Sequence, residues 1–179
     1  MDERASTSTL LDGPSSLTPR RVGYVVTTVV LTALLALAVL DGTGTATVFG
    51  VGTTTVRDSA EGIGLAVRYA EASRPALATP FDIEVHRDGG FEQPVRIAVD
   101  QEYLRMWDLN GVVPAPDTET TMGPWVVWEF EPPIGDTLFI TYDARIEPAA
   151  QEGRSGAVAV LGRGDRIVAQ VEFTTRVLP

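Results

Sequence analysis

Short runs of alternating apolar and polar residues fill the chain from about Thr47 onward, and this alternation constrains the fold more than any other feature. Successive side chains of a strand point to opposite faces of a sheet, so such a run predicts a strand with one buried face. The clearest runs cover residues 65–69, 81–85, 95–99, 126–130, 138–144, 158–160 and 167–177. Turn signals separate them, among them Asp88-Gly89 and Gly164-Asp165, which supply the positive φ angles that tight hairpins require.

These strands predict a mainly β domain over residues 47–179. Seven to nine short strands without helical periodicity or an internal repeat are typical of an antiparallel Ig-like β-sandwich. Two segments depart from the alternation. We expect one or two helical turns in residues 100–110 and a long loop over residues 111–124.

A stretch of 19 residues without a charge, residues 22–40, precedes the β domain. As a helix it would be roughly 28 Å long, close to the ~30 Å hydrocarbon core of a bilayer, so it predicts a transmembrane helix. Arg20 and Arg21 lie just before it, and no basic residue follows until Arg57. The positive-inside rule therefore predicts a cytoplasmic N-terminus and an extracytoplasmic C-terminal domain in the cell membrane.

The flanking segments complete this organisation. Residues 1–21 are rich in Ser, Thr and Pro and predict a disordered cytoplasmic tail, while residues 41–46 predict a short linker.

A cleaved signal peptide is the alternative to the transmembrane helix, because Ala36-Leu37-Ala38 matches an A-x-A cleavage site. Both alternatives export the β domain.

Thr28, Thr32 and Ala36 recur at every fourth residue of the uncharged stretch. On a helix this spacing places them on one face, where small side chains allow a second membrane helix to approach closely. We expect this stripe to pack against another integral membrane protein. The simpler interpretation is that Thr and Ala are common in this composition.

Charge and composition exclude several functions. The three acids of the first 21 residues balance three arginines, so the net charge of −10 lies entirely beyond them and disfavours nucleic-acid binding. The absence of Cys excludes disulfides, thiolate zinc sites and cysteine nucleophiles. We expect no cofactor and no metal ion.

Candidate catalytic residues are few. There is no G-x-S-x-G motif, and the single histidine, His86, falls on the outward face of a predicted strand. Glu129 and Asp143 fall on outward faces of adjacent strand runs and could lie close together, as the two carboxylates of a glycosidase do. A domain with 21 acids brings some carboxylates together by chance, so a carboxylate-dependent hydrolase is the least favoured alternative. Arg163-Gly164-Asp165 matches an integrin-recognition tripeptide, but Gly-Asp is also ordinary hairpin chemistry. We therefore expect a protein that is not an enzyme.

Outward-facing aromatic residues indicate a binding surface instead. Trp125 and Phe139 fall on the faces opposite the buried runs, and Tyr103 and Trp107 lie four residues apart in the predicted helical turns. Exposed together, these four side chains would form an apolar surface for a partner. Packing in the core is the alternative.

Four stretches carry a resemblance to a known group: Pro80–Val85, Trp128–Leu138, Tyr142–Gln151 and Val171–Pro179. They resemble uncharacterised small actinobacterial proteins with one N-terminal membrane span and an exported β domain. The resemblance implies a Gram-positive, high-GC cell envelope, in agreement with the absence of Lys. It implies no activity and no catalytic residue.

Together these features predict a membrane-anchored extracytoplasmic module for binding or assembly. The first hypothesis is an accessory subunit of another envelope or membrane protein. The alternative is a free-standing binder of cell-wall polymer or of an extracellular ligand.

Overall fold

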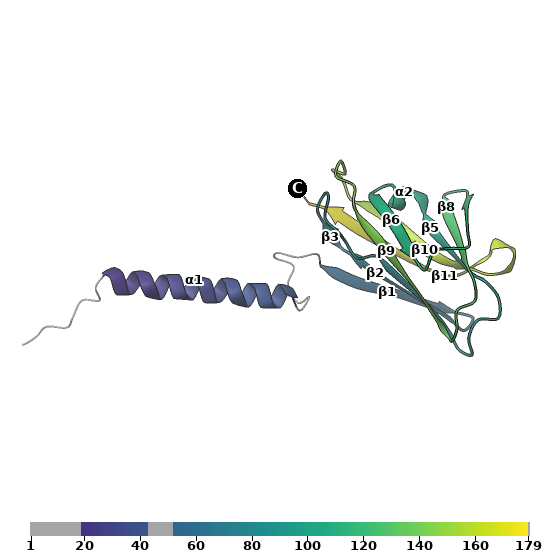
Figure 1. The fold of residues 1–179 in the computed structure, drawn as a ribbon, viewed down its shortest axis with the longest axis horizontal. Coiled ribbons are helices and arrows are strands. Elements are labelled where there is room, and N and C mark those ends of the chain that lie inside the picture. Colours follow the sequence, from purple (N-terminus) through teal and green to yellow (C-terminus); the bar gives the residue numbers. More distant parts are fainter. Residues whose placement is uncertain (1–18, 43–51, 179) are drawn as a thin grey trace, which may run out of the picture. The chain divides into compact units, whose positions relative to one another are not determined.

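The computed structural model describes residues 19–42 and 52–178, which fall in two units, Met1–Val48 and Phe49–Pro179 (Figure 1). The first unit contains helix α1, and the second is a β domain. Residues 1–18 of the predicted tail and residues 43–46 of the predicted linker lie outside the described residues.

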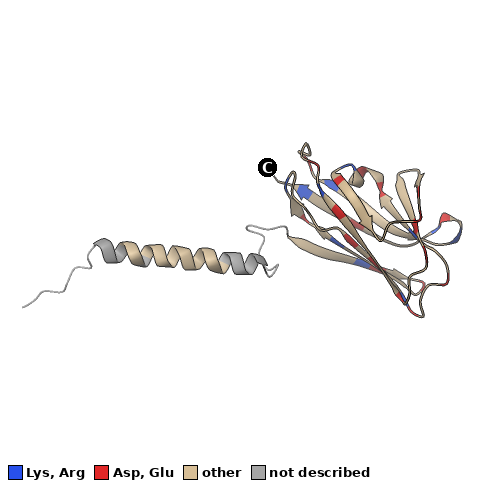
Figure 2. Ribbon diagram, viewed as in Figure 1, with Lys and Arg blue, Asp and Glu red and all other residues tan. Residues whose placement is uncertain are grey.

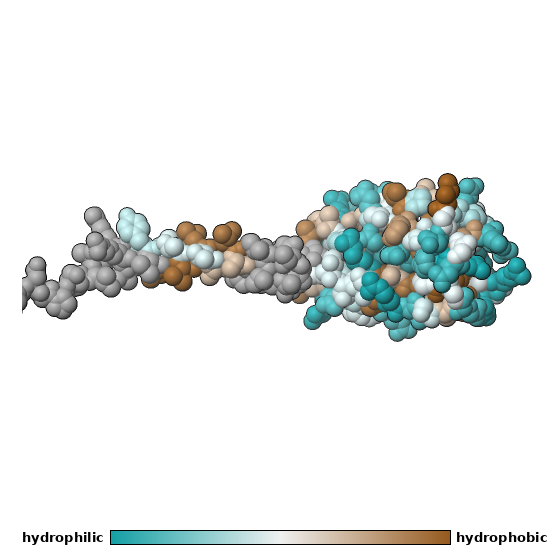
Figure 3. Space-filling view, turned by 90° about the horizontal axis from the view of Figure 1, so that it is seen from below, coloured by the Kyte–Doolittle hydropathy of each residue, from teal (hydrophilic) through white to brown (hydrophobic). Residues whose placement is uncertain are grey.

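Helix α1 (Pro19–Gly42) contains the whole predicted segment 22–40 and begins three residues earlier, inside the predicted tail. Its large apolar side chains are exposed, and Figure 3 shows some of them in brown on one face. They include Val26, Val29, Val30, Leu31, Leu34 and Leu35. The Thr28 hydroxyl donates to the Tyr24 carbonyl at 2.8 Å, one turn back. Among the described residues, no helix meets the combined length and apolar character of a membrane span.

The β domain consists of strands that are short and mostly alternate in burial. They are β1 (Thr53–Ala60), β2 (Ile63–Ala70), β3 (Ala72–Ser73), β4 (Asp82–Arg87), β5 (Val95–Asp100), β6 (Trp107–Val113), β7 (Thr118–Met122), β8 (Trp125–Phe130), β9 (Thr137–Ile146), β10 (Arg154–Leu161) and β11 (Ile167–Val177). Two short helical elements join them, α2 (Gln101–Leu104) and the 3-10 turn η1 (Arg163–Asp165).

The strands form two sheets that enclose one core (Figure 1). The five-stranded sheet has the order β1-β2-β4-β9-β6, and the six-stranded sheet has the order β3-β11-β10-β5-β8-β7. All pairs are antiparallel except β3 with β11. The structure confirms a mainly β domain built from two sheets, but eleven strands lie in the described residues, so the prediction of seven to nine was too low.

The strands missed by the sequence analysis lie at or near sheet edges. β1 has the sequence TTTVRDSA and β7 the sequence TETTM, and neither alternates apolar with polar residues. β6 and β7 occupy most of residues 107–122, so the expected loop over residues 111–124 is wrong. An edge strand is held by backbone pairing with one neighbour and need not bury a regular apolar face.

The core is centred on Phe81, whose ring centroid lies 4.7–5.8 Å from those of Tyr103, Trp107, Tyr142 and Phe173. These rings come from both sheets and from α2, so one aromatic cluster joins the two layers. The predicted helical segment 100–110 is helical only over Gln101–Leu104, because the chain then enters β6 to bury Trp107.

Two buried tyrosine hydroxyls differ in their partners. The Tyr103 hydroxyl lies 3.0 Å from Thr175 Oγ1, which in turn donates to the Ala70 carbonyl at 2.7 Å. The Tyr142 hydroxyl has no hydrogen-bond partner among the described residues. Burial raises the pKa of both phenols above the ordinary value, so both are neutral at physiological pH.

This difference predicts opposite effects of a Tyr→Phe substitution at the two positions. Tyr103→Phe removes an existing hydrogen bond and should lower the free energy of unfolding by ~1 kcal/mol. Tyr142→Phe removes an unpaired buried hydroxyl, so we expect no loss and a gain of up to ~1 kcal/mol. Urea unfolding of the two variants measures both, and a larger loss in Tyr142→Phe than in Tyr103→Phe would contradict this account.

Candidate functional site

The four aromatic residues predicted to form a partner surface do not share one surface. Tyr103 and Trp107 are buried, because α2 ends at Leu104 and both rings pack against Phe81. Trp125 is half-buried on the outer face of the six-stranded sheet, whereas Phe139 is 63% exposed on the outer face of the five-stranded sheet. The prediction of a single aromatic surface is therefore wrong.

The small-residue stripe of α1 is present as a geometric feature. Thr28, Thr32 and Ala36 are all exposed and lie one helical turn apart. Their packing against a second helix stays a prediction.

The carboxylates considered for catalysis are separated by the fold. Glu129 lies on β8 in the six-stranded sheet and Asp143 on β9 in the five-stranded sheet, both on outward faces. Two stacked sheets lie about 10 Å apart, so these carboxylates cannot act on the same bond. His86 lies on the outward face of β4, as expected. Its Nδ1 is 3.1 Å from Thr137 Oγ1, and its Nε2 is 3.1 Å from Asp88 Oδ1. The described residues contain no group of three or more His, Asp or Glu side chains arranged for a metal ion.

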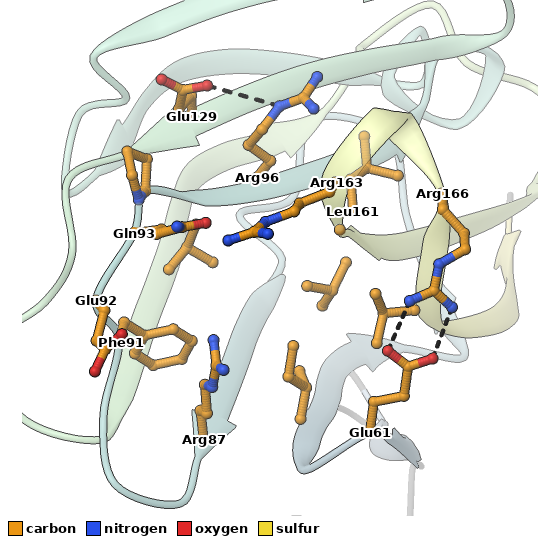
Figure 4. Close-up of a pocket in the computed structure, with 16 residues that line it drawn as sticks. Glu61, Arg87, Phe91, Glu92, Gln93, Arg96, Glu129, Leu161, Arg163 and Arg166 are labelled. Carbon is orange, nitrogen blue, oxygen red and sulfur yellow. Dashed lines mark hydrogen bonds and ion pairs between the residues drawn. The ribbon is translucent and has the colours of Figure 1, made fainter.

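A cleft of about 790 Å³ opens at one end of the sandwich (Figure 4). Three connections surround it: the β1–β2 turn, the loop at 88–94 between β4 and β5, and turn η1 between β10 and β11. Glu61 and Gly62 form the β1–β2 turn with φ angles of 53° and 75°. Two successive positive φ angles are typical of the two-residue type I′ hairpin, whose twist matches the strands. The cleft is therefore built by tight, defined turns.

The floor of the cleft is apolar largely because the core ends there. Its side chains come from both sheets and from the loop at 88–94, and they are Ile63, Phe91, Val95, Val160, Leu161 and Val168. Val95 and Val160 belong to the core, and Ile63 and Phe91 pack against it. Leu161 belongs to a small apolar cluster on the outer face of the six-stranded sheet. Arg87 continues the inward-facing series of β4 after Ile83 and Val85. The strand alternation thus directs its guanidinium toward the mouth of the core instead of the outer face.

Two of the four arginines in the cleft are engaged by carboxylates. Arg166 binds Glu61 in bidentate fashion, with both N–O distances at 2.7 Å. Arg96 donates to Asp165 at 2.6 Å and lies 3.6 Å from Glu129. Asp165, the carboxylate of the Arg163-Gly164-Asp165 tripeptide, is therefore paired within the domain.

The other two arginines, Arg87 and Arg163, form no ion pair with any residue that the structure describes. Both are exposed, and Figure 4 shows their side chains extending into the space between the two sheets, with Gln93 facing Arg163. A guanidinium presents five donors in a planar fork that matches a carboxylate or a phosphate. The cleft therefore combines an apolar floor with two unengaged anion-binding groups.

This concentration of arginine contrasts with the rest of the domain. The chain carries a net charge of −10, and Figure 2 shows acids and arginines interspersed along its strands and loops. The cleft lining contains four arginines and the three glutamates Glu61, Glu92 and Glu129. Asp165 beside it binds Arg96, so cations and carboxylates are equal in number there, unlike in the acidic chain as a whole.

The pKa of Glu61 tests the bidentate Arg166–Glu61 pair at the edge of the cleft. The hydrogen bond from Arg166 lowers the pKa of the Glu61 carboxyl below its ordinary value of 4.5. We expect an NMR titration to find this lowered pKa and its return toward 4.5 in Arg166→Gln. Because the folded state has the lower pKa, the pair stabilises the fold above pH 4.5, and this contribution is lost as the pH falls through the folded pKa. An unchanged Glu61 pKa in Arg166→Gln, with Arg74→Gln as the control, would contradict the pairing.

The sequence analysis did not identify this site. Arg87, Arg96, Arg163 and Arg166 are scattered over 80 residues. They come together only because β5 pairs with β10 in one sheet, β2 pairs with β1 and β4 in the other, and the two sheets pack on each other. One signal was available, since Arg87 interrupts an inward-facing apolar series at the end of its strand. An inward charge at a strand end indicates an opening of the core.

Comparisons with known proteins do not assign the chain to a family. No protein-family model matches the chain, and a search of curated proteins finds no relative.

Proposed function

We propose that the chain is a membrane-anchored, extracytoplasmic Ig-like module that binds a ligand in the cleft and catalyses no reaction. The observation that carries this proposal is the cleft itself, with an apolar floor and the unengaged guanidinium groups of Arg87 and Arg163. Its volume lies within the range of about 300–1,000 Å³ typical of small-molecule sites. This places the ligand-binding alternative ahead of the accessory-subunit hypothesis that the sequence favours.

The strand order supports an Ig-like topology. In Ig domains strands A, B and E are neighbours in one sheet, and strands G, F and C are neighbours in the other. Here β2, β4 and β9 take the A-B-E positions, and β11, β10 and β5 take the G-F-C positions. The domain departs from the standard order at β6, which takes the D position but precedes β7 and β8 in the chain.

The anchor is supported by the composition of α1. The described side chains of α1 carry no charge and are mostly apolar, a pattern typical of helices buried in protein or in lipid and untypical of helices facing water. The Arg20-Arg21 pair on the N-terminal side orients such a segment with its N-terminus in the cytoplasm. The proposal rests on these sequence features, since no helix of the described residues meets the criteria of a membrane span.

The position of the cleft within the domain suits a tethered binder. β1 runs from Thr53, next to the start of the described domain, to the β1–β2 turn that borders the cleft. The chain therefore enters the domain at one end of the sandwich, and the cleft opens at the other.

An accessory subunit of a membrane protein is the second candidate, favoured by a different surface. Phe139 and Val113 are 63% and 64% exposed on the outer face of the five-stranded sheet. Val113 pairs with Thr141, two residues from Phe139 on the same face, so the two apolar side chains are diagonal neighbours.

Purification of the full-length chain in a mild detergent distinguishes the two candidates. A free-standing binder should elute without a stoichiometric protein partner. Recovery of an integral membrane protein in a one-to-one ratio, lost in Phe139→Ser but retained in Ile134→Ser, would instead support the accessory subunit. Ile134 is the matched control because it is fully exposed but lies on the loop between β8 and β9, outside the sheet.

A further inference from the structure

We infer that the cleft binds an organic anion, with a carboxylate or phosphate held by Arg87 and Arg163 and an adjoining apolar group packed on the floor. This inference rests on the proposed function, because it names the ligand class of the same site. It follows from the pairing of charges, from the direction of the side chains and from the apolar lining.

The pairing of charges identifies where added negative charge would bind. Arg166 already donates two hydrogen bonds to Glu61, and Arg96 is held by Asp165 and Glu129. Arg87 and Arg163 have no carboxylate partner among the described residues, although the chain has ten more acids than bases. In an acidic chain, unpaired guanidinium groups in a cleft favour the binding of an anion there.

The direction of the two side chains makes them a joint site. Arg87 comes from the end of β4 in one sheet, and Arg163 comes from the turn after β10 in the other. Figure 4 shows both reaching into the space between the sheets, and Gln93 adds an amide beside Arg163. An oxyanion placed between them could accept hydrogen bonds from both forks, which is stronger than contact with either fork alone.

The apolar floor excludes a simple inorganic ion as the best ligand. Ile63, Phe91 and Val168 are only partly buried at the base of the cleft, next to the buried Val95 and Val160. A bare phosphate would satisfy the arginines but leave these side chains in contact with water. A ligand that also carries an aliphatic or aromatic group gains the hydrophobic contribution of covering them.

Binding of small probes to the full-length chain in nanodiscs tests this inference. The probes are phenylacetate and phenyl phosphate, each with a ring and an oxyanion, 2-phenylacetamide as the neutral analogue, and acetate and inorganic phosphate as anions without a ring. At low ionic strength we expect at least one of the two ring-bearing anions to bind saturably, about tenfold or more tighter than the neutral amide and the bare anions. The tighter of the two identifies a carboxylate or a phosphate as the natural group.

The double variant Arg87→Gln/Arg163→Gln should weaken this binding by about tenfold or more. The matched control is Arg74→Gln/Arg176→Gln, which makes the same charge change at exposed arginines outside the cleft that have no ion pair in the described residues. The control should bind as the unchanged protein does. Circular dichroism should show the same fold and thermal midpoint for both double variants, because all four side chains are exposed.

Three results would overturn the inference. The first is no saturable binding of either ring-bearing anion, and the second is equal weakening in the two double variants. The third is 2-phenylacetamide binding as tightly as the anions, with binding blocked by Val168→Trp at a partly buried position of the floor. That third result rejects the anionic ligand class but leaves the cleft as a binding site, so it separates the failure of this inference from the failure of the proposed function.

Discussion

Replacing Trp128 with aspartate should unfold the β domain. Trp128 is 2% exposed in the core, its ring centroid lies 5.3 Å from that of Tyr142, and its Nε1 donates to Glu119 Oε2 at 2.9 Å. Removing a buried Trp side chain costs ~3–5 kcal/mol, and an unpaired carboxylate in its place costs several kcal/mol more. The sum is comparable with the whole stability of a domain, about 5–15 kcal/mol.

The neighbouring residue provides the control. Glu129 lies on the opposite face of β8 and pairs with Arg96 at 3.6 Å near the surface. Glu129→Gln should change the free energy of unfolding by less than ~1 kcal/mol, because a partly exposed ion pair contributes little. Far-UV circular dichroism and urea unfolding compare the two. A folded Trp128→Asp protein would show that the face assignment of β8 is wrong.

A single methyl group at Gly156 should have the next largest effect. An added Cβ there would lie 2.5 Å from both Cβ and Cγ of Tyr103, atoms close to the backbone that cannot swing away. Tyr103 would have to leave its site and give up its hydrogen bond to Thr175. We expect Gly156→Ala to lower the free energy of unfolding by about 3 kcal/mol, from overpacking together with the lost hydrogen bond.

Gly111→Ala is the matched control for this prediction. Nothing lies within 4 Å of an added Cβ at Gly111, and its φ angle is not positive. Reducing the freedom of the unfolded chain should make this substitution neutral or stabilising by up to ~1 kcal/mol. Equal stabilities for the two alanine variants in thermal or urea unfolding would contradict the close packing of Tyr103 on β10.

The central strands were predictable because burial imposes a period of two on them. In β9 the buried side chains are Leu138, Ile140, Tyr142, Ala144 and Ile146, and every residue between them from Phe139 to Arg145 is exposed. The turn positions were predictable for a local reason, since Gly89, Gly164 and Asp165 do adopt positive φ angles. Only Gly164-Asp165 lies in a hairpin, between β10 and β11, whereas Asp88-Gly89 lies in a connection between the two sheets.

The missed features depend on contacts between residues distant in the sequence. Tyr103 and Trp107 have the spacing of neighbours on a helix, but both are buried because Phe81 and Phe173 from other strands supply an aromatic site for them. The cleft was missed for the same reason. No local pattern indicates that Asp165 neutralises Arg96 and Glu61 neutralises Arg166 while Arg87 and Arg163 stay unpaired.

Protease accessibility on intact cells, measured together with the N-terminal sequence of the mature chain, tests the proposed anchored and exported module most directly. The account predicts that protease added outside the cells digests the β domain and leaves a protected fragment that still contains the residues before Val22. A β domain that is digested only after the cells are broken, or a mature chain that begins near Val39, would contradict it.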